Sequence, residues 1–225
     1  MPPTDIIVIR RLTARDVPKL RELHSKILPV QYPASFFLQL LVLPARACFV
    51  ACRQPYPGAS NAVCVPIGFI SAAHQPPAAC FTSAGAPIVS GSSRPTLHNL
   101  VQDSQSVPDA QDQDHRHHPR VEILTLGVLP AYQQAGIARR LVHCVVDAFR
   151  DESCAVNSSL DQDSLCALDH KPPPMLIYAN VSTKNDDALL FYERIGMAVA
   201  PGVLRGLYKT AAWGTRDAYL VVGVV

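Results

Sequence analysis

Residues 124–142 read LTLGVLPAYQQAGIARRLV, and this segment is more informative about the fold than any other part of the 225-residue chain. An apolar run ends at Gly127, Pro130 begins a turn, and Gly136 and Ala138 precede apolar residues at helical spacing. The pattern predicts a strand, a turn and a helix. Small residues at a helix start let backbone N–H groups approach an anion, whose charge the helix dipole favours. The segment is therefore a candidate phosphate cradle, although an ordinary turn into a helix would explain the same glycine.

Strand and helix patterns alternate on both sides of this segment. Strands are expected at 6–12, at 47–53 and 65–73 (an antiparallel pair), at 120–128, at 175–181, and near 198–209 and 218–225. Helices are expected from the Thr13–Asp16 capping box to Leu28, from Tyr32 to Leu43, over 136–150, and over 186–195, with Asn185 as the cap of the last one. This order predicts an α/β protein built on a mixed sheet.

Two segments interrupt these patterns. Residues 76–119 hold six prolines, residues 151–174 end in three, and neither repeats with the period of a strand or a helix. Both are interpreted as insertions, disordered or loosely packed, in a single domain over residues 1–225. They hold nine acidic and three basic residues of a chain whose net charge is +2, so the remainder is basic. A basic domain suits a ligand that carries phosphate groups, whereas the near balance of the whole chain argues against a nucleic-acid partner.

The cysteines and the apolar runs indicate in which cellular compartment the protein works. Seven scattered cysteines without a C-x-x-C pair indicate reduced thiols in the cytoplasm. The first residues lack the apolar core of a secretory signal, and the longest apolar runs fall short of the ~20 residues that a membrane helix needs. His115, His117 and His118 are interpreted as solvated loop histidines, and no metal site is expected.

Two motifs together resemble a known superfamily. The order Gln133-x-x-Gly136-x-Ala138 after a strand, followed by Asn185 and the later FYERIG at 191–196, resembles the GCN5-related N-acetyltransferase (GNAT) superfamily. Residues 28–32 (LPVQY) and 123–127 (ILTLG) are similar to the F-P-V-x-Y turn and the I-M-T-L-G strand of the NatE-type catalytic subunits of protein N-terminal acetyltransferases. The resemblance covers the 157 residues outside the insertions.

The resemblance implies a fold and an activity. The fold would be a mostly antiparallel central sheet with flanking helices. The activity would be transfer of acetyl from acetyl-coenzyme A to the free α-amine of protein N-termini, with Met as the expected first residue, by direct attack in a ternary complex. Peptide or nascent-chain N-termini would be the partners, and a ribosome-associated acetyltransferase complex is a further partner that the resemblance allows.

The resemblance also implies roles for particular residues. The coenzyme would lie against Leu126, Gly127, Val128, Gln133, Gln134, Ala135, Gly136, Ile137, Ala138, Arg139, Asn185, Ala188 and Tyr192. The peptide would lie against Leu28, Pro29, Val30, Tyr32, Leu124 and Tyr208. Tyr192 would donate a proton to the leaving thiolate. Ordinary structural roles stay open for Pro29 and Val30, as a helix terminator and a core contact, and for Arg139 on a solvated helix face.

The chain departs from the NatE-type pattern at the two positions where that family carries its catalytic base residues. The family carries Tyr and His at the positions of Glu122 and Asn180. Glu122 shares strand parity with Leu124 and Leu126, so it would face the same side as the substrate pocket, and we expect it to act as the base through a water; an ion-paired strand residue is the alternative. Asn180 cannot accept a proton but can hold a water or a peptide carbonyl. Two other functions therefore stay open: an enzyme of the same fold that acetylates lysine or a small amine, and a catalytically weak scaffold that binds coenzyme A.

Overall fold

The structure is a computed structural model that describes residues 6–54, 64–75, 120–158 and 174–225. The expected insertion at 76–119 and residues 159–173 of the second one lie outside the described residues. The histidine cluster at 115–118 lies outside them as well.

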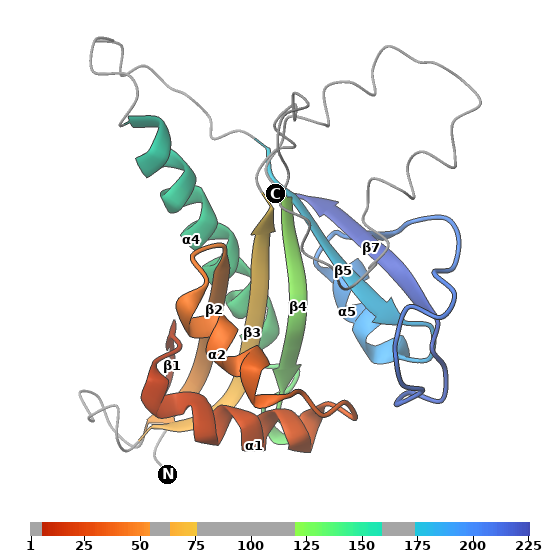
Figure 1. The fold of residues 1–225 in the computed structure, drawn as a ribbon, viewed down its shortest axis with the longest axis horizontal. Coiled ribbons are helices and arrows are strands. Elements are labelled where there is room, and N and C mark those ends of the chain that lie inside the picture. Colours follow the sequence, from red (N-terminus) through yellow and green to blue (C-terminus); the bar gives the residue numbers. More distant parts are fainter. Residues whose placement is uncertain (1–5, 55–63, 76–119, 159–173) are drawn as a thin grey trace.

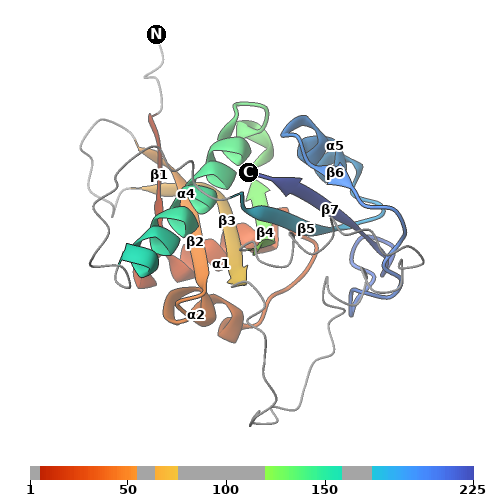
Figure 2. The same ribbon diagram turned by 90° about the horizontal axis from the view of Figure 1, so that it is seen from above.

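The described strands form one sheet in the order β1-β2-β3-β4-β5-β7-β6 (Figure 1, with β6 labelled in Figure 2). Their bounds are β1 Ile6–Arg11, β2 Arg46–Gln54, β3 Val65–Gln75, β4 Arg120–Val128, β5 Leu176–Ser182, β6 Ala198–Val199 and β7 Ala218–Val224. The pairing of β4 with β5 is parallel, and the other neighbouring pairs are antiparallel. The mixed, mostly antiparallel sheet is thereby confirmed.

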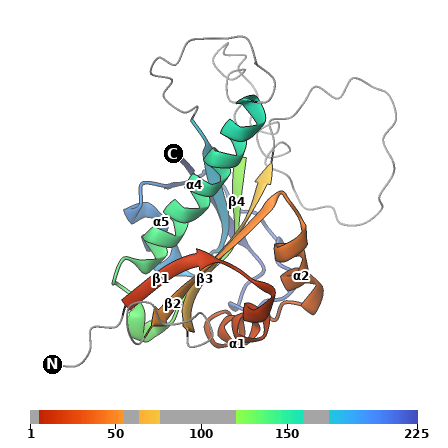
Figure 3. The same ribbon diagram turned by 90° about the vertical axis from the view of Figure 1, so that its left-hand side faces the viewer.

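Helices cover both faces of the sheet. Their bounds are η1 Ala14–Asp16, α1 Val17–Ile27, α2 Ala34–Val42, η4 Pro130–Tyr132, α4 Ile137–Ser158 and α5 Asp186–Arg194. Figures 2 and 3 show α1 and α2 on one side of the sheet and α4 on the other. Side chains of α4 and α5 share one buried cluster with the sheet, and those of α1 and α2 share a second. We call these faces the α4 face and the α1/α2 face.

A buried carboxylate fixes the start of α1. The backbone N–H of Thr13 donates to Asp16 over 2.9 Å, as the capping box predicts. Arg10 of β1 donates to both carboxylate oxygens of Asp16, over 2.6 and 2.8 Å. The Arg10 guanidinium holds the pKa of Asp16 well below its ordinary value. Asp16 therefore ties β1, the turn and the amino-terminal end of α1 together as a charged group.

Two elements differ from the sequence-based expectation. Helix α4 continues to Ser158, eight residues past the expected end at Arg150, because no Pro or Gly interrupts DESCAVNS. The strand expected near 198–209 shrinks to Ala198–Val199. Pro201 lies two residues after Val199, and proline cannot donate to a ladder. The remaining residues up to Asp217 fold back as an irregular segment with one bridge, between Leu204 and Ala218.

Candidate active site

The central feature of the site is the place where β4 and β5 separate. Their paired residues run from Arg120 with Leu176 to Ile123 with Ala179 and stop there. Beyond that point β4 continues beside β3, and β5 continues beside β7. Figure 1 shows the two strands close at one end and wide apart at the other. We call the separated part the open end.

A β-bulge on β4 marks the start of the open end. Ser71 of β3 pairs with Thr125, but the next residue, Ala72, pairs with Ile123, so Leu124 is an extra residue on β4. A bulge bends its strand and increases the local twist. The bend therefore falls one residue after the last pair between β4 and β5.

The bulge also changes which side chains share a face. Leu124 packs against the cluster on the α1/α2 face, whereas Leu126 packs against the cluster on the α4 face. The expectation that Glu122, Leu124 and Leu126 share a face is wrong for Leu126, because the extra residue reverses the alternation. Val121 and Ile123 belong to the cluster on the α4 face, so Glu122 between them lies on the α1/α2 face with Leu124.

Backbone N–H groups of β4 point into the open end. The N–H of Leu129 donates to the carbonyl of Ile67 in β3 over 2.8 Å. Because successive N–H groups of a strand point to opposite edges, those of Val128 and Leu126 point away from β3. Groups in this position are suited to donate to an oxygen that gains negative charge. Gly127, which was expected beside Leu126 and Val128 as a coenzyme contact, allows close packing instead: a Cβ there would lie 2.8 Å from both Ile27 and Phe69.

The turn before α4 forms an anion cradle. Gln134 and Gly136 have left-handed backbones, with φ of 61° and 75°. Alternation of left- and right-handed residues brings successive N–H groups together in an anion-binding nest. The first helical bond runs from the N–H of Arg140 to the carbonyl of Gly136, so the N–H groups of the three preceding residues have no acceptor within the helix. These three are Ile137, Ala138 and Arg139.

Gln133 has a structural role in this turn. Its side-chain amide donates to the carbonyl of Val128 over 3.0 Å, and its N–H donates to that of Pro130 over 3.2 Å. Gln133 thereby ties the turn to the end of β4. Apart from the adjoining backbone, no atom of the described residues lies within 4 Å of the place where a Cβ of Gly136 would stand, so the turn leaves space there. The arrangement fits a phosphate group at the start of α4.

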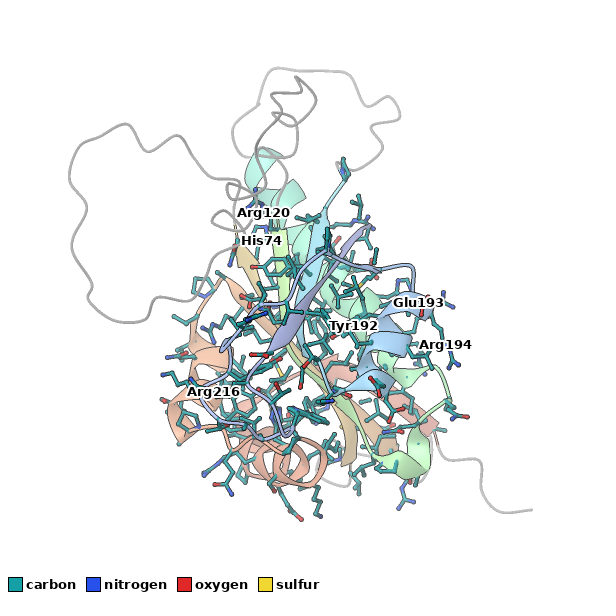
Figure 4. All side chains as sticks on the ribbon, turned by 90° about the vertical axis from the view of Figure 1, so that its right-hand side faces the viewer. His74, Arg120, Tyr192, Glu193, Arg194 and Arg216 are labelled. Carbon is teal, nitrogen blue, oxygen red and sulfur yellow. The ribbon has the colours of Figure 1, made fainter. Side chains whose placement is uncertain are left out.

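Helix α5 supplies a buried tyrosine on the α4 face. Tyr192 is 5% exposed and points toward the sheet, whereas Glu193 and Arg194 lie on the outer side of α5 (Figure 4). Burial, and then the neighbouring Tyr208, raise the pKa of Tyr192, so its hydroxyl stays protonated. Asn185 caps the helix by accepting a bond from the N–H of Ala188 over 3.3 Å, as expected.

The residues expected to contact a peptide come from three segments. Leu28, Tyr32 and Leu124 pack against the cluster on the α1/α2 face, and Pro29 and Val30 lie in the turn between α1 and α2. The structure thus brings Leu28 and Tyr32 to the face that Leu124 occupies at the open end.

Tyr208 lies in the segment between β6 and β7 and contacts β5. Its hydroxyl donates to the backbone carbonyl of Asn180 over 2.8 Å. The side chain of Arg216, labelled in Figure 4, donates from Nε to the backbone carbonyl of Tyr208 over 2.9 Å. The backbone carbonyl of Arg216 accepts from the N–H of Tyr208, also over 2.9 Å. The segment between β6 and β7 therefore folds onto the end of β5, next to the expected Asn180.

Two groups of functional interest were missed in the sequence. The side chain of Tyr178, which is 4% exposed, is hydrogen-bonded to Glu122 and to Gln75. Tyr178 precedes Asn180 by two residues, so strand alternation places both on one face, and this was the signal available. His24 of α1 is buried against the ring of Phe69, and its position within an aromatic cluster has no local sequence signature.

A metal site, a reactive thiol and a membrane helix each have requirements with which the described residues can be compared. No group of three or more His, Cys, Asp or Glu among these residues could hold a metal ion. Burial raises the pKa of the Cys48 and Cys52 thiols, so they are protonated and unreactive. Within the same ranges, no helix has the length and hydropathy needed to cross a membrane.

Comparison with known proteins gives a family and a set of similar folds. The family model described as Acetyltransferase (GNAT) family matches residues 17–168. The structure of Arabidopsis thaliana NAA60 in complex with acetyl-CoA is similar at a TM-score of 0.64 and 20% identity, over 98% of this chain and 99% of that one. The structure of the same protein with a bisubstrate analogue gives a TM-score of 0.62 at 21% identity, over 98% and 99%. Arabidopsis thaliana Naa50 with the bisubstrate analogue CoA-Ac-MVNAL gives 0.56 at 17% identity, over 96% and 97%. No curated protein matches the chain. At these identities the structural likeness shows a shared fold.

Proposed function

The chain belongs to the acetyltransferase (GNAT) family, and on that premise we propose that it transfers an acetyl group from acetyl-coenzyme A to the free α-amine of a protein N-terminus. The observation behind the proposal is the open end between β4 and β5. The anion cradle of α4 lies on one side of it, and the turn between α1 and α2 lies on the other. Two proteins of similar fold, NAA60 with acetyl-CoA and Naa50 with CoA-Ac-MVNAL, support this choice of donor and acceptor.

The donor site uses backbone groups more than side chains. Acetyl-coenzyme A supplies the acetyl group as an activated thioester. The N–H groups from Gln134 to Arg139 would hold its phosphates at the start of α4. Leu126 and Val128 would donate to the thioester oxygen as it gains charge. Ala188 and Asn185 would line the coenzyme between its phosphates and its thioester, and Asn185 would do so by capping the start of α5.

The acceptor must lose a proton before or during attack. An α-amine has an ordinary pKa of about 7.7–8.0, so a weak base suffices near neutral pH. Glu122 lies on the α1/α2 face, two residues before Leu124 and so about 7 Å along the strand. That separation leaves room for one water between its carboxylate and an amine at the open end. Asn180 would hold the water or a peptide carbonyl.

Tyr192 would stabilise the leaving sulfur as a hydrogen-bond donor. Its raised pKa lies above the value of about 8.5 of an ordinary thiol, so full proton transfer to a thiolate is unfavourable. A donated hydrogen bond stabilises the thiolate without that transfer.

The acceptor surface favours an apolar first side chain. Leu28, Pro29, Val30 and Leu124 would form its wall, and the hydroxyls of Tyr32 and Tyr208 would stand near the first peptide groups. Methionine suits such a wall because it is flexible and apolar. We further propose one catalytic domain over residues 1–225 with insertions at 76–119 and 151–174, the second of which begins with the last residues of α4. It would act in the cytoplasm on nascent or finished N-termini, alone or in a larger acetyltransferase complex.

A pair of peptides tests the proposal. One starts with Met, has a free α-amine and contains no lysine; the other has the same sequence with a blocked α-amine and one added lysine. Mass spectrometry of the peptide and release of free thiol report transfer. We expect acetylation of the first peptide alone, and a lower kcat for Glu122→Gln with an unchanged KM for acetyl-coenzyme A. Equal turnover of the blocked peptide would instead indicate lysine acetylation, and coenzyme binding without turnover of either would indicate a scaffold.

A further inference from the structure

Tyr178 and Glu122 form a cross-strand pair at the joint between β4 and β5. They are direct partners in the parallel register, one pair before the strands separate. Ile177 and Ala179 belong to the cluster on the α4 face, so Tyr178 between them lies on the α1/α2 face, as Glu122 does. The phenol is therefore buried beside the proposed base, one residue pair before the end of the pairing between β4 and β5.

Hydrogen-bond chemistry gives this contact a direction. An ionised carboxylate only accepts, so the hydroxyl of Tyr178 donates its single hydrogen to Glu122. The bond with Gln75 must then run the other way, from the side-chain amide to the phenol oxygen. The effects on the pKa of Tyr178 agree, because the bond to Glu122 raises it and the bond from Gln75 lowers it. Gln75, Tyr178 and Glu122 thus form a directed chain.

The surroundings leave Tyr178 as an uncharged donor. Burial is the main cause of its raised pKa, so the phenol keeps its hydrogen at neutral pH. Arg120, two residues before Glu122 on β4, is the nearby cation that acts on Tyr178. His74 of β3 lies on the opposite face, stacked on Phe149 of α4 with ring centroids 5.3 Å apart.

We propose that Tyr178 is a positioning residue that fixes the carboxylate of Glu122 for proton removal. It holds the carboxylate of Glu122 at the joint and thereby sets the direction in which the carboxylate faces the open end. Gln75 is the third member, since its bond to the phenol oxygen turns the phenol hydrogen toward Glu122. This role rests on the proposed function of Glu122 as the base.

The decisive measurement is the pKa of Glu122 in the intact protein. The chain holds four glutamates, Glu22, Glu122, Glu152 and Glu193, so carbon NMR of protein labelled at the glutamate carboxyl carbons gives few signals. The signal missing from Glu122→Gln is that of Glu122. Tyr178→Phe keeps the ring and removes the donor, so we expect the pKa of Glu122 to rise by about one unit. Tyr219→Phe, which removes a hydroxyl from β7, is the matched control. An unchanged pKa of Glu122 in Tyr178→Phe overturns the proposal.

A second variant covers a failure of Tyr178→Phe to fold. Gln75→Leu leaves the ring and the hydroxyl in place but removes the bond that orients the hydroxyl. We expect a smaller rise of the pKa of Glu122 in this variant, and no rise would overturn the proposal in that case.

Kinetics separate this inference from the proposed function. With the Met-starting peptide, Tyr178→Phe should raise the apparent pKa of the acidic limb in the pH profile of kcat by the same amount as the pKa of Glu122. The plateau value of kcat should fall about tenfold, and the KM for acetyl-coenzyme A should not change. Added to Glu122→Gln, the same change should have no further effect. If the acidic limb persists in Glu122→Gln, Glu122 is not the base, and the positioning role in catalysis falls with it. If the parent protein has no turnover, the proposed function fails, and the NMR result alone decides whether Tyr178 holds Glu122.

Discussion

Mild acid should destabilise the protein through His24. This residue is 2% exposed, and neither ring nitrogen has a hydrogen-bond partner within the described structure. Its ring stacks on Phe69 with centroids 3.8 Å apart and meets Tyr32 and Phe37 edge-on. Burial lowers the pKa of His24 to about 4, because a charged imidazole has no compensation among these rings.

The sign and size of the effect follow from this pKa. The unfolded chain binds a proton at His24 below about pH 6.5, whereas the folded chain does so only near pH 4. Between these values the unfolded state holds more protons, so the free energy of unfolding falls by about 1.4 kcal/mol for each unit of decreasing pH. The stabilisation is complete above about pH 6.5, and about 3 kcal/mol is lost by pH 4. A typical domain has about 5–15 kcal/mol in total.

Urea unfolding between about pH 7 and pH 4.5, followed by circular dichroism, measures the effect. We compare the parent with His24→Leu, which replaces the ring with an apolar side chain, and with His143→Gln, which removes an exposed histidine from α4. Near pH 7 the loss of stacking opposes the removal of two unpaired nitrogens, so His24→Leu should stay close to the parent. Toward pH 4.5 it should become more stable than the parent by about 2–3 kcal/mol. Parallel pH curves for the parent and His24→Leu would refute the reasoning.

Three further substitutions test the fold and the site. Asp16→Asn should cost about 2 kcal/mol at neutral pH, because Arg10 loses its buried, charged partner. Since the pKa of Asp16 is lowered in the fold, the cost should shrink below about pH 4 in urea titrations; a pH-independent cost would count against the charge pair. Gly127→Ala should lower thermal stability by about 2 kcal/mol, because its Cβ would lie 2.8 Å from Phe69. An unchanged melting temperature would show that the ring yields freely. Gly136→Ala should cost about 1 kcal/mol for its positive φ and raise the KM for acetyl-coenzyme A but not for peptide. Equal KM values in parent and variant would argue against phosphate binding at this turn.

The elements around the site were predictable because their signals are local. The strand, turn and helix of residues 124–142 follow from apolar spacing together with Pro130 and Gly136. The caps at Thr13 and Asn185 follow from side-chain chemistry within three residues.

The details that matter most for chemistry depend on pairing between distant segments. The bulge at Leu124 exists only relative to β3, so regular alternation placed Leu126 on the wrong face. The contact between Tyr178 and Glu122 arises from the register of β4 with β5, and these two residues are 56 positions apart in the sequence. The continuation of α4 beyond Arg150 was missed because its polar residues obscure the helical period, although none of them breaks a helix.

The joint between β4 and β5 also determines where this chain can tolerate changes in length. Gln75 at the end of β3, Arg120 at the start of β4 and Leu176 at the start of β5 lie in one row across the sheet. Residues 76–119 therefore link β3 to β4 at the joined edge, and residues 159–173 link the end of α4 to the segment before β5, which starts at the same edge, about one strand length from the open end. The entropic cost of closing a loop rises by only about 0.6 kcal/mol for each doubling of its length. We therefore expect changes of length in these two connections to leave the separated strands, and the chemistry proposed for them, in place.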